Sequence, residues 1–292
     1  MIRSTKFLIL SGMLLLGSRA FAQDTNFWVF VCFGQSNMEG FPGIEAQDKE
    51  GVDPRFRFLA AVDFPNQDRK KGEWYSAVPP LCRPNSGISP ADYFGRTLVS
   101  NLPPSIRVGV VTVAVAGCKI ELFDKDNFKS YATSSNTATW MKRIIETYSG
   151  NPYQHLVDTA KLAQKDGVIK GILLHQGESN NNDKDWPNKV KAIYENLLKD
   201  LDLKAEETPL LTGELVHADQ NGACASMNNK VIADLPKTIP TAHIVSSQGC
   251  KARRDRLHFA PTGYREFGKR YAETMLPLLG YKPKALESQS DK

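Results

Sequence analysis

The chain has few of the residues that build metal centres. Its 292 residues include five histidines and five cysteines. The cysteines show no C-x-x-C spacing, and His155, His217 and His243 are scattered without the spacing typical of metal ligands. The sequence also lacks a nucleotide-type glycine loop. We therefore expect neither a metal nor another cofactor.

The cysteines are too few and too irregular to define a disulfide framework. They are Cys32, Cys82, Cys118, Cys224 and Cys250. An oxidising compartment would permit one or two disulfides among them, but the sequence leaves the pairing open, and an odd number leaves at least one thiol single. Cys32 lies inside an apolar run, and we interpret it as a buried apolar residue.

An excess of charge of one sign is also missing. The formal net charge is +5, and the first 22 residues hold three basic residues and no acidic one, which leaves +2 for the rest. This balance gives no reason to expect binding to nucleic acid or to an anionic membrane. We also find no internal repeat or low-complexity tract.

The one long apolar run, Phe7 to Leu16, is too short to span a membrane. Arg3 and Lys6 precede it, and Ala20-Phe21-Ala22 follows as a small-x-small cleavage site, so residues 1–22 predict a signal peptide. An uncleaved anchor is the alternative. We expect an exported protein, periplasmic or secreted and without stable membrane insertion, with one domain over residues 23–281 and a polar tail over 282–292.

Short apolar runs rich in β-branched and aromatic residues alternate with helical patterns along the chain. The runs predict strands at 27–33, 106–115, 168–174, 209–216 and 242–245. Helical patterns cover 90–98, 140–165 with a break at 150–152, 190–201 and 264–275. This alternation predicts an α/β fold, with a mostly parallel sheet of about five strands covered on both faces.

The segment from Pro42 to Pro90 contains seven prolines and reads as loop-rich. Its aromatic residues argue against disorder, so we expect either an ordered excursion bordering the site or a surface loop without substrate contact.

Four motifs follow the predicted strands or lie in the final loop. Right-handed crossovers bring the carboxyl ends of parallel strands to one edge of the sheet. We therefore expect Ser36, Gly117, Gln176 and His258 to meet in one cleft. Ser36 is the candidate nucleophile, because it follows the first buried strand.

A serine hydroxyl needs a base and an oriented acid. Asp255 lies three residues before His258, a spacing that lets the carboxylate hold the imidazole Nδ1 proton and leaves Nε2 to accept the Ser36 proton. A surface Asp-His pair is the alternative interpretation.

An oxyanion site is the remaining requirement. The backbone N–H groups of Ser36 and Gly117 and the side-chain amide of Gln176 are candidate donors. Glu178 is a second candidate acid. A plain turn at Gly117, and a structural role for the turn from His175 to Asn180, remain possible alternatives.

Together these motifs resemble the SGNH hydrolase superfamily. Gly34-Gln35-Ser36-Asn37-Met38, Gly117, His175-Gln176-Gly177-Glu178 and Asp255-Arg256-Leu257-His258-Phe259 are similar to the sialate O-acetylesterase and family 6 carbohydrate esterase (acetylxylan esterase) group. The resemblance runs from about Phe27 to Met275. It implies a three-layer, flavodoxin-like α/β/α domain that removes O-acetyl groups from sugars without a metal.

The resemblance also implies roles for individual residues. Ser36 is the nucleophile, His258 the base and Asp255 the usual acid, and the oxyanion donors are the Ser36 and Gly117 N–H groups and Gln176. Gln176 stands where the wider superfamily has asparagine. Some members are argued to use the glutamate of the H-Q-G-E motif, here Glu178, which leaves the acid open.

From this resemblance we expect a serine esterase that deacetylates xylan or a related acetylated carbohydrate. A sialic acid O-acetylesterase, a non-catalytic carbohydrate-binding domain and an O-acetyltransferase are the alternatives. Four aromatic residues are candidates to stack on sugar faces. They are Trp74, Tyr75, Trp140 and Trp186. The sequence says nothing about the oligomeric state.

Overall fold

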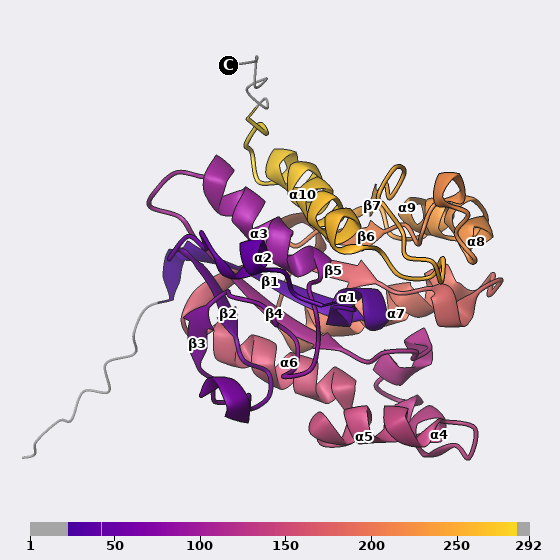
Figure 1. The fold of residues 1–292 in the computed structure, drawn as a ribbon. Helices are drawn as coiled ribbons and strands as arrows, with labels where there is room; N and C mark the ends of the chain where they lie inside the picture. The colour runs from indigo at the N-terminus through magenta and orange to yellow at the C-terminus, as the bar shows by residue number, and fades with distance from the viewer. Residues whose placement is uncertain (1–22, 42, 285–292) are drawn as a thin grey trace, which may run out of the picture.

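The computed structural model describes residues 23–41 and 43–284 (Figure 1). The expected signal peptide, residues 1–22, and most of the expected tail lie outside the described residues. In the part that is described, no helix combines the length and apolar character needed to cross a membrane.

A single seven-stranded sheet forms the centre of the described structure. Its strands are β1 (Asp24–Gly34), β2 (Phe56–Leu59), β3 (Trp74–Ser76), β4 (Arg107–Ala114), β5 (Gly167–His175), β6 (Leu210–Gly213) and β7 (Ala242–Val245). The order is β3-β2-β4-β1-β5-β6-β7, and only the β2–β3 pair is antiparallel. The predicted α/β class and mostly parallel sheet are confirmed.

The sheet has two strands more than predicted, and both come from the loop-rich segment 42–90. β2 and β3 contain four and three residues. Strands this short show no readable alternation of apolar and polar side chains. They form because β2 pairs with β4, and β3 in turn pairs with β2 at the edge of the sheet.

Helices pack on both faces of the sheet, and Figure 1 shows α3 and α10 on one face and α6 on the other. The helices are α1 (Ser36–Glu39), α2 (Ala46–Lys49), α3 (Pro90–Asn101), α4 (Phe128–Thr133), α5 (Thr139–Thr147), α6 (Pro152–Ala163), α7 (Trp186–Asp200), α8 (Ala225–Lys230), α9 (Leu235–Thr238) and α10 (Pro261–Leu278). The predicted break lies between α5 and α6. There Pro152 opens α6, and the Asn151 side chain accepts the Gln154 N–H.

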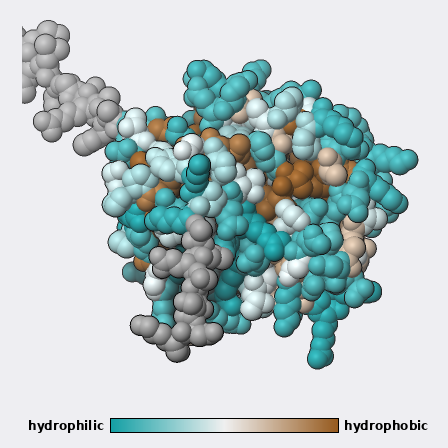
Figure 2. All heavy atoms as spheres, turned by 90° about the horizontal axis from the view of Figure 1, so that it is seen from above, coloured by the Kyte–Doolittle hydropathy of each residue, from teal (hydrophilic) through white to brown (hydrophobic). Residues whose placement is uncertain are grey.

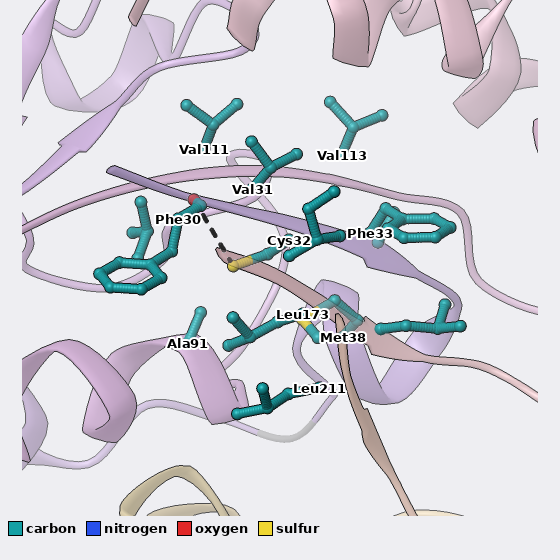
Figure 3. Packing of buried hydrophobic residues seen from close by; sticks show 14 of the residues in the cluster. Phe30, Val31, Cys32, Phe33, Met38, Ala91, Val111, Val113, Leu173 and Leu211 are labelled. Carbon is teal, nitrogen blue, oxygen red and sulfur yellow. Dashed lines mark hydrogen bonds between the residues drawn. The ribbon is translucent and has the colours of Figure 1, made fainter. Parts of the chain in front are cut away.

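The core surrounds β1, the middle strand, whose residues Val29 to Phe33 are fully buried. Figure 3 shows Phe30 and Cys32 of this strand among side chains from its neighbours and from α3. The rings of Phe30 and Phe94 meet edge to face with centroids 4.8 Å apart. Continuous burial on both faces explains why β1 is apolar without alternation from Val29 to Phe33.

All five cysteines are buried free thiols, so the described structure contains no disulfide. Burial raises the pKa of the Cys82 thiol to about 12 and that of Cys250 to about 11, and these thiols stay protonated at neutral pH. Cys32 packs as the apolar residue that its position in the first strand predicts.

The outer surface over α3 and α10 is largely hydrophilic, with hydrophobic residues visible only in small separate patches (Figure 2). Large exposed apolar side chains in the described residues are Phe41, Trp140 and Leu278. Two of these three border the cavity described below.

Close contact between α10 and α3 depends on Gly268. A Cβ at this position would lie 2.4 Å from the Pro90 carbonyl oxygen. We predict that Gly268→Ala lowers the free energy of unfolding by about 1 to 3 kcal/mol, because the backbone clash outweighs the better helix propensity of alanine. Urea unfolding measures this change.

Gly43→Ala is the matched control for Gly268→Ala. A Cβ at Gly43 would meet nothing within 4 Å, so this variant should unfold at the wild-type urea concentration. A more stable Gly268→Ala protein would contradict the close packing of the two helices.

Candidate active site

The turn after β1 brings Ser36 to the carboxyl edge of the sheet. Gly34 has a φ of +149°, and a Cβ there would lie 2.1 Å from the His175 carbonyl oxygen. The Gln35 N–H donates to that same oxygen at 3.1 Å. Only glycine permits this approach of two backbones. The chain then enters α1, with Ser36 as its first residue and 7% exposed.

Ser36, His258 and Asp255 form a continuous hydrogen-bonded chain. Ser36 Oγ lies 2.9 Å from His258 Nε2, and His258 Nδ1 lies 3.0 Å from Asp255 Oδ2. An ionised carboxylate only accepts hydrogen bonds, so Nδ1 carries the imidazole proton and Nε2 is free to accept the Ser36 proton. The geometry is that of a serine nucleophile with its base and orienting acid.

Backbone N–H groups of its own loop hold the Asp255 carboxylate in place. Its Oδ1 accepts the N–H groups of Leu257 and His258, each at 3.0 Å. Burial raises the pKa of the Asp255 carboxyl, but the hydrogen bonds from His258 and Leu257 outweigh it, and the pKa lies below its ordinary value. Asp255 is therefore ionised at neutral pH.

Asn37 connects the serine turn to the histidine loop. Its Nδ2 donates to the Leu257 carbonyl at 3.0 Å and to Glu178 Oε1 at 2.6 Å, while its Oδ1 accepts the Tyr264 hydroxyl. Asn37, the neighbour of Ser36, thus bonds to Leu257, the neighbour of His258. This fixes the distance between the two reactive side chains.

Glu178 lines the cavity but makes no hydrogen bond or ion pair with His258 in the described structure. Its Oε1 lies 3.9 Å from His175 Nδ1 in addition to its bond with Asn37. Burial lowers the pKa of His175, which stays neutral, so the glutamate gains no charged partner there. The two candidate acids are thus separated by geometry: Asp255 reaches the imidazole and Glu178 does not.

Gly117 and Ser36 supply two backbone N–H groups at the cavity. Gly117 has a φ of +70°, and a Cβ there would lie 2.9 Å from the Trp140 ring. Within residues 23–41 and 43–284, neither N–H donates to a protein acceptor. Both residues line the same cavity, so both N–H groups are available to a developing oxyanion.

Gln176 is not at the cavity, which corrects the expectation that its amide is an oxyanion donor. The side chain is fully buried. Its Nε2 donates to Gln35 Oε1, the Cys118 carbonyl and Asn180 Oδ1 at 2.7 to 3.2 Å, and its Oε1 accepts the Trp186 indole N–H at 2.6 Å. With these partners, Gln176 binds the strand-end loops to one another.

The cavity has a volume of about 540 Å³. It is lined by Gln35, Ser36, Glu39, Gly40, Phe41, Asn85, Ala116, Gly117, Trp140, Ile144, Glu178, Ser179, Leu257 and His258. Asn85 comes from the loop-rich segment, so part of that segment does border the site. In the described residues, no group of three or more Cys, His, Asp or Glu side chains is arranged to hold a metal ion.

Of the aromatic residues proposed to stack on sugars, only Trp140 lines the cavity. Trp186 is fully buried against Gln176, and Trp74 donates its indole N–H to Asp166. Phe41 also lines the cavity, although no sequence motif pointed to it, and its ring stacks on His258 with centroids 4.1 Å apart and an interplanar angle of 28°. The only feature of the sequence that could have placed Phe41 near the site is its position five residues after Ser36.

Solved structures share this fold. The chain matches a protein from Arabidopsis thaliana at 20% identity and a TM-score of 0.63, covering 86% of this chain and 98% of the other. It matches NanS at 16% identity and a TM-score of 0.60, covering 88% of this chain and 98% of NanS. It also matches XAC1771, a carbohydrate acetylesterase from Xanthomonas citri, at 18% identity and a TM-score of 0.55. That match covers 84% of this chain and 55% of XAC1771.

Residues 26–277 match the family model described as "Carbohydrate esterase, sialic acid-specific acetylesterase". The match spans most of the chain and includes all four motifs at the carboxyl edge of the sheet. The resemblance noted in the sequence is confirmed. The chain belongs to this family of carbohydrate esterases, and it is a carbohydrate O-acetyl esterase.

Proposed function

We propose that this esterase is exported and removes acetyl groups from xylan or a related acetylated polysaccharide through an acyl-enzyme on Ser36. The observation that carries the proposal is the hydrogen-bonded chain from Ser36 Oγ through His258 to Asp255, opening into a cavity with two available backbone N–H groups. The export part rests on the sequence of residues 1–22, and N-terminal sequencing of the protein recovered outside the cytoplasm tests it.

In the first step His258 Nε2 takes the Ser36 proton while Oγ attacks the acetyl carbonyl carbon. The carbonyl electron pair moves to oxygen, and the N–H groups of Ser36 and Gly117 stabilise the resulting oxyanion. When the carbonyl re-forms, the bond to the sugar oxygen breaks and His258 donates its proton to that oxygen. The sugar leaves with a free hydroxyl, and acetyl-Ser36 remains.

In the second step water replaces the sugar. His258 removes a proton from water as the water oxygen attacks the acetyl carbonyl carbon, and the same two N–H groups stabilise the second oxyanion. Ser36 Oγ then leaves and regains its proton from His258. Acetate is released, and Asp255 remains ionised throughout because it serves only to orient the imidazole and stabilise its charged form.

The rim of the cavity supports a carbohydrate as the leaving group. Phe41 is 43% exposed and Trp140 is 51% exposed, and both line the cavity beside the reactive residues. Exposed aromatic rings offer flat apolar faces with a low entropy cost of ordering, which suits contact with a sugar ring. These residues form the surface on which we place the sugar.

A sialic acid carrying an O-acetyl group is the second candidate substrate, because the family description names that sugar. Acetate release from acetylated xylan, pectin, mannan and O-acetyl sialic acid separates the candidates. We expect the highest kcat/KM on xylan or another polysaccharide, and a preference for sialic acid would favour the second candidate. Turnover only with an acceptor sugar would indicate an O-acetyltransferase, and binding without turnover a carbohydrate-binding domain.

We predict that Ser36→Ala lowers kcat for an aryl acetate by about 10³-fold or more, because no other group supplies the nucleophile. The same loss should occur in acetate release from acetylated xylan. Ser100→Ala is the matched control, since Ser100 is exposed on α3 and its hydroxyl bonds only to Thr97 and Asn101 of the same helix. Wild-type turnover in Ser36→Ala would exclude Ser36 as the nucleophile.

We also predict different effects for the two candidate acids. Asp255→Asn should lower kcat by about 10³- to 10⁴-fold, because asparagine cannot hold the Nδ1–H tautomer as a carboxylate does. Glu178→Gln should cost less than about tenfold, since its amide oxygen can still accept from Asn37. Steady-state kinetics on the aryl acetate measures both, and a larger loss in Glu178→Gln would reverse the assignment.

A further inference from the structure

The orientation of the Gly117 N–H depends on two neighbouring peptide groups. The Ala116 N–H, immediately before it, donates to Glu39 Oε2 at 2.8 Å. The Gly117 carbonyl, immediately after it, accepts the Ser179 hydroxyl at 2.9 Å. Both sides of the candidate oxyanion donor are therefore held by side chains from other elements.

Glu39 is the last residue of α1 and lies three positions after Ser36. It is 6% exposed, and its carboxylate has two separate partners: Oε1 pairs with Arg83, and Oε2 accepts the Ala116 N–H. Since one short helix carries both Ser36 and Glu39, the bond to Ala116 fixes the Gly117 turn relative to the nucleophile.

A lone negative charge at this position would oppose the reaction, because an oxyanion develops in the same cavity. Arg83 compensates for the charge of Glu39. Its side chain is only 15% exposed, and the attraction of Glu39 raises the pKa of the guanidinium despite its burial. The pair presents a hydrogen-bond acceptor to Ala116 without a net charge.

We propose that Glu39 is a positioning residue that aims the Gly117 N–H at the oxyanion, with Arg83 as its counter-charge. The inference rests on the proposed acyl-enzyme mechanism. Because Gln176 does not reach the cavity, the two backbone N–H groups of Ser36 and Gly117 carry the stabilisation of the oxyanion. A small displacement of either donor is then costly, as displacements of about 1 Å cost about 10²-fold in rate.

Two double variants test this proposal without leaving a buried unpaired charge. Glu39→Gln with Arg83→Met keeps an oxygen that can accept the Ala116 N–H, and Glu39→Met with Arg83→Met removes that acceptor at similar volume. We predict that the Glu39→Gln/Arg83→Met protein keeps kcat for an aryl acetate within about fivefold of wild type. The Glu39→Met/Arg83→Met protein should lose about 10- to 100-fold in kcat, with KM changed less than about threefold.

Arg55→Met is the control for loss of a partly buried guanidinium. Arg55 lies just before β2, at the opposite edge of the sheet from Ser36. It pairs with Asp53 and donates to the backbone carbonyls of Val99 and Pro103. This variant should lower Tm and leave kcat within about twofold, which separates loss of stability from loss of positioning.

Equal kcat values in the two double variants, whether both high or both low, would overturn the role of Glu39 as the acceptor for Ala116. Such a result leaves the esterase mechanism intact as long as Ser36→Ala abolishes turnover of the same aryl acetate. If Ser36→Ala retains turnover, the proposed mechanism itself has failed. The two failures are therefore distinguishable in one set of assays.

Discussion

The site depends on one close contact between two backbones, where the end of β1 passes the end of β5. Gly34 lies against the His175 carbonyl, and the Gln35 N–H bonds to it. A side chain at Gly34 would separate the strands at the point where the chain turns into α1. This contact places the serine turn against the loop after β5, and the remaining loops are arranged around that turn.

Helix α1 and the residue before it connect to all the loops of the site. Gln35 accepts from the loop after β5, Asn37 bonds to the loop that carries His258, and Glu39 bonds to the turn after β4. Ser36 stands among these three contacts and makes the reactive one. The motif around the nucleophile thus organises the site as well as supplying its reactive group, with each polar side chain holding a different segment.

Much of the site was predictable because strand ends in a parallel sheet meet at one edge. Ser36 follows a strand that is unmistakably apolar, and Asp255 and His258 lie in one local turn, so their meeting needed no information about distant residues. The choice of Asp255 or Glu178 as the acid was harder, because both lie in loops at that edge of the sheet. It depends on the Asn37 side chain, which takes Glu178 as its partner.

Other features depend on contacts between residues far apart in the chain. The position of Gln176 after a strand end predicts a donor to the oxyanion. In the structure its amide instead forms hydrogen bonds with the buried side chains of Gln35, Asn180 and Trp186. Glu39 looks like an ordinary charged residue until Arg83 and Ala116 are seen beside it. Strands β2 and β3 exist only through pairing with neighbours, which no short-range pattern records.

The cavity wall contains two kinds of side chain, and the difference determines where the enzyme can be redesigned. Gln35, Glu39 and Ser179 each hold backbone of another loop, so changing them alters the geometry of the reaction. The exposed rings of Phe41 and Trp140 instead present free surface to the rim. A library that varies Trp140, and preserves the loop-holding residues and Phe41, whose ring stacks on His258, can therefore explore new leaving groups on an unchanged catalytic frame.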